Sequence, residues 1–261
     1  MKLLKSSLVS IIMPLYNAQN VLTESIKSVL QQSYDNFEII IVDDCSSDGS
    51  YQVAISLAGT DSRIKVIQNI ENFGPGISRI NGINASKGCF IAFIDSDDLW
   101  AIDKLRIQLD FMQKYGAKFS YTAFRRFSID QITKARTFGR LISIPASMSY
   151  RNLLSNTAIA TSTVIIDRTI LPDLRQIETS KIYVEDYILF FGILKAGEVA
   201  YGLNKELMLY RVQPNSFSRN KLKYALKVWR TYRFVEGLGR LETISYFSRY
   251  AVRGTLKYLR F

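Results

Sequence analysis

Residues 8–50 read LVSIIMPLYNAQNVLTESIKSVLQQSYDNFEIIIVDDCSSDGS, and this stretch decides the fold. Leu8 to Met13 is a continuous apolar run of strand length, and Phe37 to Val42 is a second one. Between them, residues 21–30 carry apolar side chains at the spacing of one helix face. Strands without alternating polar residues are buried on both faces, as in parallel sheets. The stretch therefore predicts a strand–helix–strand unit of a parallel sheet.

The alternation continues through residue 94 and is looser afterwards. We expect helices over 50–57 and 76–85 and strands over 64–67 and 89–94, which predicts an α/β fold with a doubly wound parallel sheet. Ligands of such sheets bind at the carboxyl ends of the strands. Farther along, the pattern predicts helices over 104–115 and 186–194 and extended segments over 117–124, 161–166 and 206–211. Residues 125–150 are less patterned, which indicates an excursion or an acceptor-facing loop.

The composition excludes several kinds of chemistry. The chain has 261 residues, of which 48% are hydrophobic, and it has no histidine. A Ser-His-Asp triad, an imidazole base and a His-ligated zinc are therefore excluded. Two cysteines, Cys45 and Cys89, are too few for a disulfide framework, so we expect a cytoplasmic protein. The apolar runs are shorter than a membrane-spanning helix needs, and the first residues lack the cleavage site of a signal peptide.

The positive charge is concentrated at the C-terminal end. The formal net charge is +11, and residues 219–261 contain eleven Lys and Arg against two acidic residues, a net of +9. The rest of the chain is nearly neutral. In residues 221–235 and 244–260, basic and apolar residues recur at helical spacing, which predicts two amphipathic helices. Two explanations remain open: the helices pack on the body with a solvated basic face, or they attach to an anionic membrane surface.

Acidic residues follow two of the expected strands. Asp43 and Asp44 follow the second, and Asp95, Asp97 and Asp98 follow the strand over 89–94. Alternation along an extended backbone places Asp95 and Asp97 on one side, where their carboxylates suit Mn²⁺ or Mg²⁺ shared with substrate phosphates. Such acids can instead cap helices or form turns. Adjacent carboxylates repel one another without a cation, which favours the metal site and a nucleoside diphosphate as its partner.

Other ligand classes fit the sequence less well. The first strand lacks a glycine-rich dinucleotide fingerprint, and GxxxxGK[ST] does not occur, which disfavours nicotinamide and P-loop chemistry. A sugar nucleotidyltransferase remains an alternative, although we would expect a basic glycine-rich loop after its first strand. A non-catalytic nucleic-acid-binding protein would explain the basic end but not the acidic loops, so we expect no nucleic-acid partner.

Three runs together resemble a known family. They are the run over 9–50, NFGPGISRINGINASKGCFIAFIDSDDLW over 72–100, and VEDYILFFGILKAG over 184–197. In order and spacing they resemble the inverting nucleotide-sugar glycosyltransferases of family 2, from residue 8 to about residue 218. The resemblance implies a GT-A fold, a Rossmann-like, mostly parallel sheet flanked by helices. It places a catalytic domain at 1–218 and a basic helical extension at 219–261.

The resemblance also implies roles for individual residues. Asp186 matches the catalytic base, and Asp95 and Asp97 match the Asp-X-Asp metal motif for Mn²⁺ or Mg²⁺. Asp186 could also simply cap its helix. Arg79 and Arg211 could be surface or ion-pair residues. The matched nucleotide-sugar-binding positions are Pro14, Tyr16, Asp44, Arg79, Asp95, Ser96 and Arg211.

One late segment departs from the family pattern. Tyr210-Arg211 and Asn215-Ser216 match a segment that closes over the donor. Gln213 stands where many relatives have a histidine, so a contact of that histidine with metal or diphosphate would be altered here.

The resemblance further implies a reaction. A carboxylate takes the proton of an acceptor hydroxyl as it attacks the anomeric carbon, and a single displacement inverts that centre. We expect a UDP-hexose or UDP-N-acetylhexosamine donor and a saccharide acceptor on a lipid diphosphate carrier, as in O-antigen, capsule or lipopolysaccharide synthesis. Such an acceptor would place the enzyme on the inner face of the cytoplasmic membrane.

Overall fold

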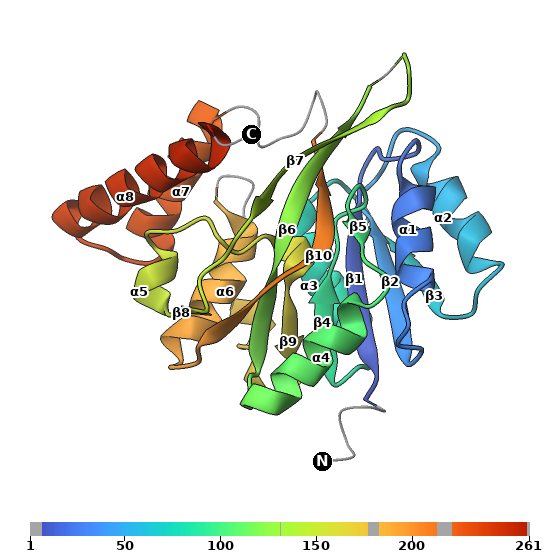
Figure 1. Cartoon of the computed structure of the whole chain (residues 1–261), viewed down its shortest axis with the longest axis horizontal. Coiled ribbons are helices and arrows are strands. Elements are labelled where there is room, and N and C mark those ends of the chain that lie inside the picture. Colours follow the sequence, from blue (N-terminus) through green and yellow to red (C-terminus); the bar gives the residue numbers. More distant parts are fainter. Residues whose placement is uncertain (1–6, 131, 177–182, 213–220, 260–261) are drawn as a thin grey trace.

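The computed structural model describes residues 7–130, 132–176, 183–212 and 221–259. Ten strands of this part form one sheet in the order β3-β2-β1-β4-β9-β6-β10-β5, with β7 paired to β6 and β8 to β10 (Figure 1). The strands are β1 (Val9–Leu15), β2 (Phe37–Asp43), β3 (Ile64–Gln68), β4 (Phe90–Phe93), β5 (Leu99–Trp100), β6 (Phe119–Ile129), β7 (Arg136–Ile142), β8 (Ser147–Met148), β9 (Ile165–Asp167) and β10 (Ala200–Arg211).

Helices flank this sheet on both faces. They are α1 (Leu22–Leu30), α2 (Ser50–Ala58), α3 (Pro75–Ala85), α4 (Lys104–Tyr115), α5 (Tyr150–Leu153), α6 (Glu185–Lys195), α7 (Lys221–Arg230) and α8 (Arg240–Leu259). A π-helical turn at Thr231–Val235 follows α7, and 3₁₀ turns occupy Thr161–Thr163, Arg168–Ile170 and Leu174–Gln176. None of the helices in the described ranges is both long and apolar enough to cross a bilayer.

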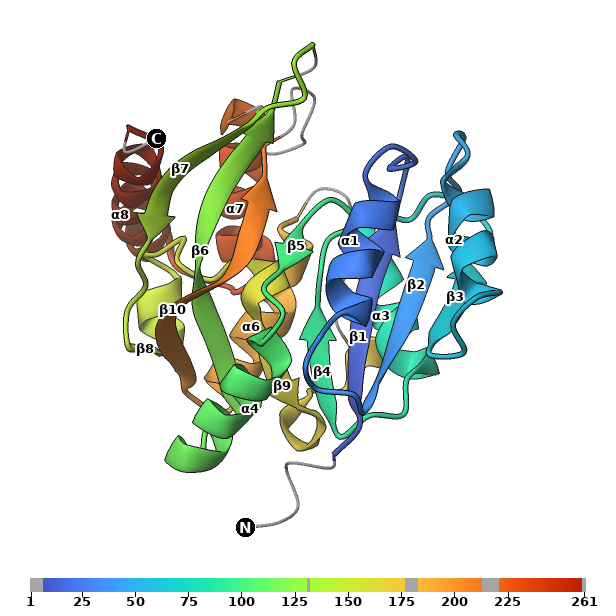
Figure 2. The same cartoon turned by 45° about the vertical axis from the view of Figure 1, so that its right-hand side comes forward.

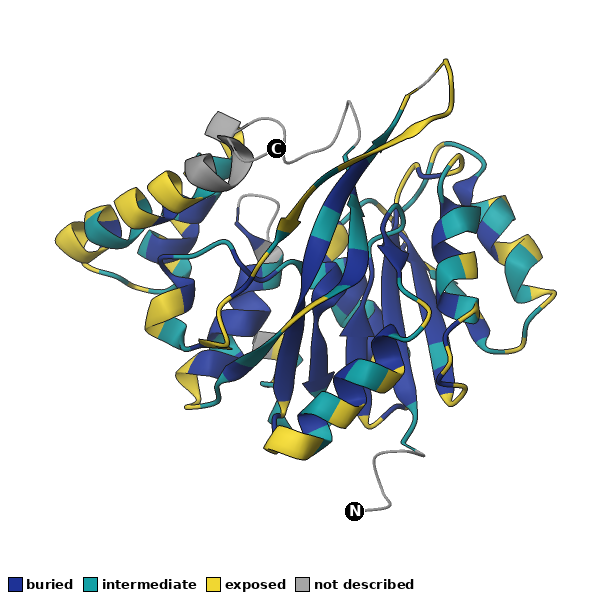
Figure 3. Ribbon diagram, in the orientation of Figure 1, coloured by how far each residue is buried: buried dark blue, intermediate teal, exposed yellow. Residues whose placement is uncertain are grey.

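The strand directions confirm the expected mostly parallel sheet. β3, β2, β1 and β4 are mutually parallel, and β10 is parallel to β6, whereas β9 runs antiparallel between β4 and β6. Successive side chains of β1 enter different cores, because Ile11 and Met13 pack with α1, α2 and α4 while Ile12 packs with α3 and α6. Figure 3 shows the central strands buried between partly exposed helices, whereas β7 is largely exposed.

Two expected elements differ from the structure. Residues 161–163 form a 3₁₀ turn rather than a strand, and their hydroxyls bond to Asp186, Asp98 and the carbonyl of Ala160. Residues 125–150 are not simply an excursion, because β6 continues to Ile129 and forms a hairpin with β7. The hairpin projects past the carboxyl ends of the parallel strands (Figures 1 and 2).

The C-terminal helices share a core with the rest of the described chain. Val228, Tyr232 and Tyr250 are buried in the same cluster as α3 and α6, and the Tyr232 hydroxyl donates to the Leu154 carbonyl at 2.5 Å. The expected domain boundary at residue 218 lies outside the described residues. A truncation there would remove buried aromatic side chains as well as the basic helices.

Candidate active site

Two turns that hydrogen-bond to each other lie at the carboxyl edge of the sheet. Asn17, after β1, and Cys45, after β2, have left-handed backbones, with φ of 48° and 58°, which non-glycine residues rarely adopt. The Asn17 side chain accepts a hydrogen bond from the Ser47 N–H at 2.8 Å, and the Asn17 N–H donates to Ser46 Oγ at 3.1 Å. Each turn therefore supports the strained conformation of the other, as is common at functional sites.

Asp44 ties the end of β2 to the start of α3. Its carboxylate accepts hydrogen bonds from the backbone N–H of Phe73 at 2.9 Å and of Gly74 at 2.7 Å, and from Asn69 Nδ2 at 2.8 Å. Gly74 has φ of 93° and Pro75 opens the helix, the positions that these residue types favour. Asp43 is buried at the end of β2 and accepts a hydrogen bond from Gln68 Nε2 at 2.9 Å. Asp44 thus positions the loop before α3.

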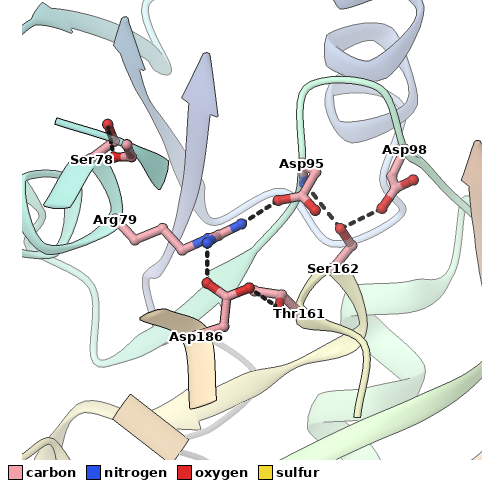
Figure 4. A network of polar contacts seen from close by, with 8 residues as sticks. Ser78, Arg79, Asp95, Asp98, Thr161, Ser162 and Asp186 are labelled. Atoms are coloured by element: carbon pink, nitrogen blue, oxygen red, sulfur yellow. Dashed lines mark hydrogen bonds and ion pairs between the residues drawn. The ribbon is translucent and has the colours of Figure 1, made fainter. Parts of the chain in front are cut away.

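Arg79 joins the two residues matched to base and metal ligand. It lies on α3, is buried, and donates to Asp95 Oδ1 at 2.5 Å and to Asp186 Oδ1 (Figure 4). Asp186 is the second residue of α6, and its other oxygen accepts from Thr161 Oγ1 at 2.8 Å. One guanidinium therefore holds together a carboxylate from the loop after β4 and one from α6, so Arg79 is a buried ion-pair arginine rather than a surface one.

The surroundings of Asp186 suit a general base. Burial raises the pKa of its carboxyl above the ordinary value of 3.8, the Arg79 charge opposes that rise, and the Asp95 charge adds to it. The side chain keeps 27% of its exposure, so a hydroxyl could reach it. Asp186 is the second residue of α6 rather than its N-cap, which is Val184, and its two carboxylate oxygens bind the side chains of Arg79 and Thr161. Capping therefore does not account for this aspartate.

Asp95, Asp97 and Asp98 lie together in the loop between β4 and β5. Asp98 is buried and accepts from Ser162 Oγ at 2.6 Å and from the Arg211 N–H at 3.0 Å. Burial raises its pKa well above the ordinary value, and the Asp97 and Asp95 charges raise it further. Ser162 Oγ also accepts from the Asp95 N–H at 3.0 Å. Sequence reasoning missed Ser162 because its residue type carries no signal apart from its neighbours.

This group fits a divalent cation. Within the described ranges, no three His, Cys, Asp or Glu side chains gather in a way that could hold a metal ion by themselves. Mg²⁺-type sites commonly use one or two carboxylates and complete their shell with water and substrate phosphates. Asp95 and Asp97 are partly exposed and supply two such carboxylates. A cation between them would also offset the repulsion that raises the pKa of Asp98.

Arg211 is directed at the acidic loop. Its Nε donates to the Asp97 carbonyl at 2.7 Å, its Nη2 donates to Glu24 at 2.5 Å, and its guanidinium lies 4.7 Å from the Phe127 ring centre. The side chain is 4% exposed. Glu24 was not singled out from the sequence, since an acidic residue in the first turn of a helix is common.

The remaining expected contacts lie around the same edge. Pro14 is buried in β1 beside Val42, whereas Tyr16 is 52% exposed just after the strand. Ser96 is partly exposed in the turn that the Asp98 N–H closes on the Asp95 carbonyl at 3.1 Å. The late positions Gln213, Asn215 and Ser216 lie outside the described residues.

The C-terminal region supports the start of α6. Thr231, the first residue of the π turn, accepts a hydrogen bond from the Val184 N–H at 3.0 Å and donates to the Lys227 carbonyl at 2.9 Å. The Lys227 charge also lowers the pKa of Asp186, although less than burial raises it. The basic extension is therefore a neighbour of the candidate base.

Comparisons with known proteins agree with this geometry. Residues 10–171 match the model of "Glycosyl transferase family 2". The chain is 38% identical to the putative teichuronic acid biosynthesis glycosyltransferase TuaG of Bacillus subtilis, over 97% of this chain and 98% of that protein. It is 35% identical to the UDP-Glc:alpha-D-GlcNAc-diphosphoundecaprenol beta-1,3-glucosyltransferase WfgD of Escherichia coli, over 96% and 95% of the two chains.

Solved structures agree in fold. S. aureus TarS 1–349 in complex with UDP-GlcNAc superposes with a TM-score of 0.70 at 19% identity, covering 94% of this chain and 72% of that one. The mannosyltransferase PcManGT of Pyrobaculum calidifontis, in complex with GDP-Man and Mn²⁺, gives 0.66 at 15% identity, with 95% and 73% covered. These likenesses establish the GT-A fold. Together, the family match and the near full-length relatives show that this chain is a glycosyltransferase and belongs to glycosyl transferase family 2.

Proposed function

We propose that the chain is a metal-dependent, inverting hexosyltransferase that moves a sugar from a UDP-sugar to a hydroxyl of a lipid-diphosphate-linked saccharide. The observation that carries this proposal is the bridge from Asp186 through Arg79 to Asp95. It holds a carboxylate suited to proton removal beside the carboxylates suited to a cation. A donor bound at Asp95 and Asp97 would thus present its anomeric carbon near Asp186.

The residues have separate tasks in this reaction. Asp186 accepts the proton of the attacking hydroxyl, and its raised pKa brings it nearer to neutral pH, where a base works best. Asp95 and Asp97 would hold Mn²⁺ or Mg²⁺, which neutralises charge on the departing diphosphate when bound. Arg79 holds the carboxylates of Asp186 and Asp95 next to each other. The reaction is a single displacement, which inverts the anomeric centre. Pro14, Tyr16, Asp44 and Ser96 would contact the donor at the edge of the sheet.

The names of relatives support the substrate classes. WfgD and WfaP of Escherichia coli, the latter 34% identical over 96% of this chain, are both named as UDP-Glc-dependent beta-1,3-glucosyltransferases acting on alpha-D-GlcNAc-diphosphoundecaprenol. TarS was solved with UDP-GlcNAc. A UDP-hexose or UDP-N-acetylhexosamine donor and a lipid diphosphate acceptor fit these names and the acidic edge of the sheet. Synthesis of a bacterial surface polysaccharide is the corresponding process.

The test is a panel of nucleotide sugars with a synthetic lipid diphosphate sugar and Mn²⁺, read by mass spectrometry. We expect a product heavier by one sugar from a UDP-sugar, loss of product with EDTA, and a β-linkage from an α-linked donor. Transfer from no member of the panel, or a product with retained configuration, would contradict the proposal. Pyrophosphate release from UTP and a sugar phosphate would instead indicate a nucleotidyltransferase.

The same acceptor leads us to propose peripheral attachment to the inner face of the membrane. On α8, Thr243 and Tyr250 face the core, whereas Leu241, Ile244 and Val252 are 83%, 53% and 59% exposed. These three residues lie on the side of α8 that points away from the core, and Arg249 is exposed beside them. An outward apolar stripe flanked by positive charge matches an anionic bilayer, which offers both hydrocarbon and negative headgroups.

A further inference from the structure

An ionic cluster joins four segments next to the metal-motif loop. Glu24, in the first turn of α1, accepts from Arg211 at the end of β10 and from Arg136 at the start of β7. Phe127 of β6 lies beneath both arginines, with ring-centre distances of 4.7 Å to Arg211 and 5.7 Å to Arg136. We call Glu24, Phe127, Arg136 and Arg211 the Glu24 cluster. Its members come from α1, β6, β7 and β10.

Arg211 connects this cluster to the acidic loop. Its side-chain Nε binds the Asp97 carbonyl, and its backbone N–H binds the Asp98 carboxylate. Both bonds fix the loop from the side of β10. Because the guanidinium is 4% exposed, its direction is set by the groups that contact it rather than by water.

The charge balance of the cluster depends on Glu24. Two guanidinium groups lie against one aromatic ring, and their like charges repel. The Glu24 carboxylate binds both and offsets that repulsion. Arg211 is buried while Glu24 is 35% exposed, so removing this carboxylate leaves a buried guanidinium with less compensation, which costs more than the pair contributes. Without Glu24, Arg211 would therefore turn from Phe127 toward water and release the Asp97 carbonyl.

We propose that Glu24 is a positioning residue: through Arg211 it holds Asp97 and Asp98 in the orientation that receives the divalent cation. This inference rests on the proposed metal-dependent function and deepens it. It also changes the expected role of Arg211, from a contact of the donor diphosphate to a clamp on the metal-motif loop. Carboxylates that bind metals are generally oriented by hydrogen-bonded partners behind them.

The test measures Mn²⁺ binding in the presence of UDP, by electron paramagnetic resonance and calorimetry, without sugar transfer. Glu24→Gln keeps the size of the side chain and removes its charge, and we expect its Mn²⁺ dissociation constant to rise about tenfold, as for other partners of metal ligands. The double variant Glu24→Gln/Arg136→Gln has the net charge of the wild-type cluster, and we expect the same loss. It keeps the test decisive if the single variant does not fold.

Two control variants distinguish an effect of Glu24 through Arg211 from an effect of losing some other charged side chain. Arg136→Gln leaves Glu24 paired with Arg211 and should bind Mn²⁺ as the wild type does. Glu198→Gln removes the carboxylate of a different ion pair, with Lys118, and should also have no effect. Wild-type affinity in both Glu24 variants, or equal losses in Arg136→Gln, would overturn the inference while leaving the proposed function in place. A wild-type protein that binds no Mn²⁺ with UDP would overturn both.

Discussion

At the scale of single residues, the proposed function depends on the contact of Arg79 with two carboxylates. Asp186 and Asp95 lie 91 positions apart and both bind this buried guanidinium. Burial raises the pKa of Asp186 while the Arg79 charge opposes the rise, so this carboxylate is a stronger base than a free aspartate and keeps a cationic partner. The two predictions below separate the base from its partner.

Asp186→Asn should lower kcat at least about a hundredfold, because the amide cannot accept the proton of the acceptor hydroxyl. Donor affinity should change little, since Asp95 and Asp97 remain. Calorimetry with a UDP-sugar, together with single-turnover transfer, measures the two effects separately. The matched control is Asp61→Asn, whose carboxylate pairs with Arg63 before β3. Transfer at the wild-type rate in Asp186→Asn would rule this residue out as the base.

Arg79→Met should move the acidic limb of the kcat/KM pH profile to higher pH. Burial raises the pKa of Asp186 while Arg79 opposes the rise, so removing the cation raises this pKa further. A base must be deprotonated, and activity therefore falls as pH decreases through its pKa. The neighbouring Asp95 and Lys227 charges remain and act in opposite directions. An unchanged acidic limb would show that another group controls it.

At the scale of elements, the position of α6 depends on a segment that follows it in the chain. Asp186 is carried by the first turn of α6, and the N–H of Val184 at the N-cap binds Thr231 Oγ1. Orphan N–H groups at a buried helix start need such acceptors. Close packing holds α3 in a similar way, since a Cβ on Gly82 would lie 2.5 Å from Ile12 Cγ2. Arg79 is one turn earlier on that helix.

Thr231→Val should destabilise the protein by about 1–3 kcal/mol, because it leaves the buried Val184 N–H without its acceptor. It should also lower kcat, because the first turn of α6 is then free to shift. Thr243→Val is the matched control: it is equally buried, and its hydroxyl donates to the Gly239 carbonyl within the C-terminal region. Thermal melts measure the stability of the two variants, and initial rates measure their kcat. Equal losses of kcat in both variants would contradict a specific role for Thr231.

At the scale of the whole molecule, the basic helices pack against the body with one face and expose another. Tyr150 and Lys195 of the body bind Glu236, at 2.5 Å and 2.6 Å, where the chain turns between α7 and α8. This contact and the shared core mean that membrane attachment has to be tested by surface substitutions in the full chain rather than by truncation.

Leu241→Glu should weaken binding to phosphatidylglycerol vesicles roughly tenfold, since it replaces a side chain whose burial contributes about 1.5–3 kcal/mol. Ile55→Glu makes the same charge change at an exposed position of α2, far along the sheet from α8 (Figure 1), and should have little effect. Co-sedimentation measures both, and higher salt should weaken wild-type binding. Equal binding by the two variants would contradict docking through α8.

Several features follow from local sequence alone. Apolar runs and helical spacing predicted β1, α1, β2 and the elements up to β4, and α4 was expected over the residues that form it. Periodicity is a local property that reports which side chains avoid water. The same strand ends located Asp44, Asp95 and Asp97, because the ends of parallel strands meet at one edge. The absence of histidine left carboxylates as the available bases.

Only the tertiary structure decided which of these residues meet. Arg79 and Asp186 are 107 positions apart, and Glu24 and Arg211 are 187 apart. Residues 161–163 form a turn because their hydroxyls bind Asp186 and Asp98, partners that no local pattern includes. Contacts across such separations form only when the packed sheet and helices bring the segments together, since packing rather than propensity repays the entropy of closing long loops. The sequence thus determined the elements and the acidic residues at their ends, and the packed fold determined the pairs that make a site.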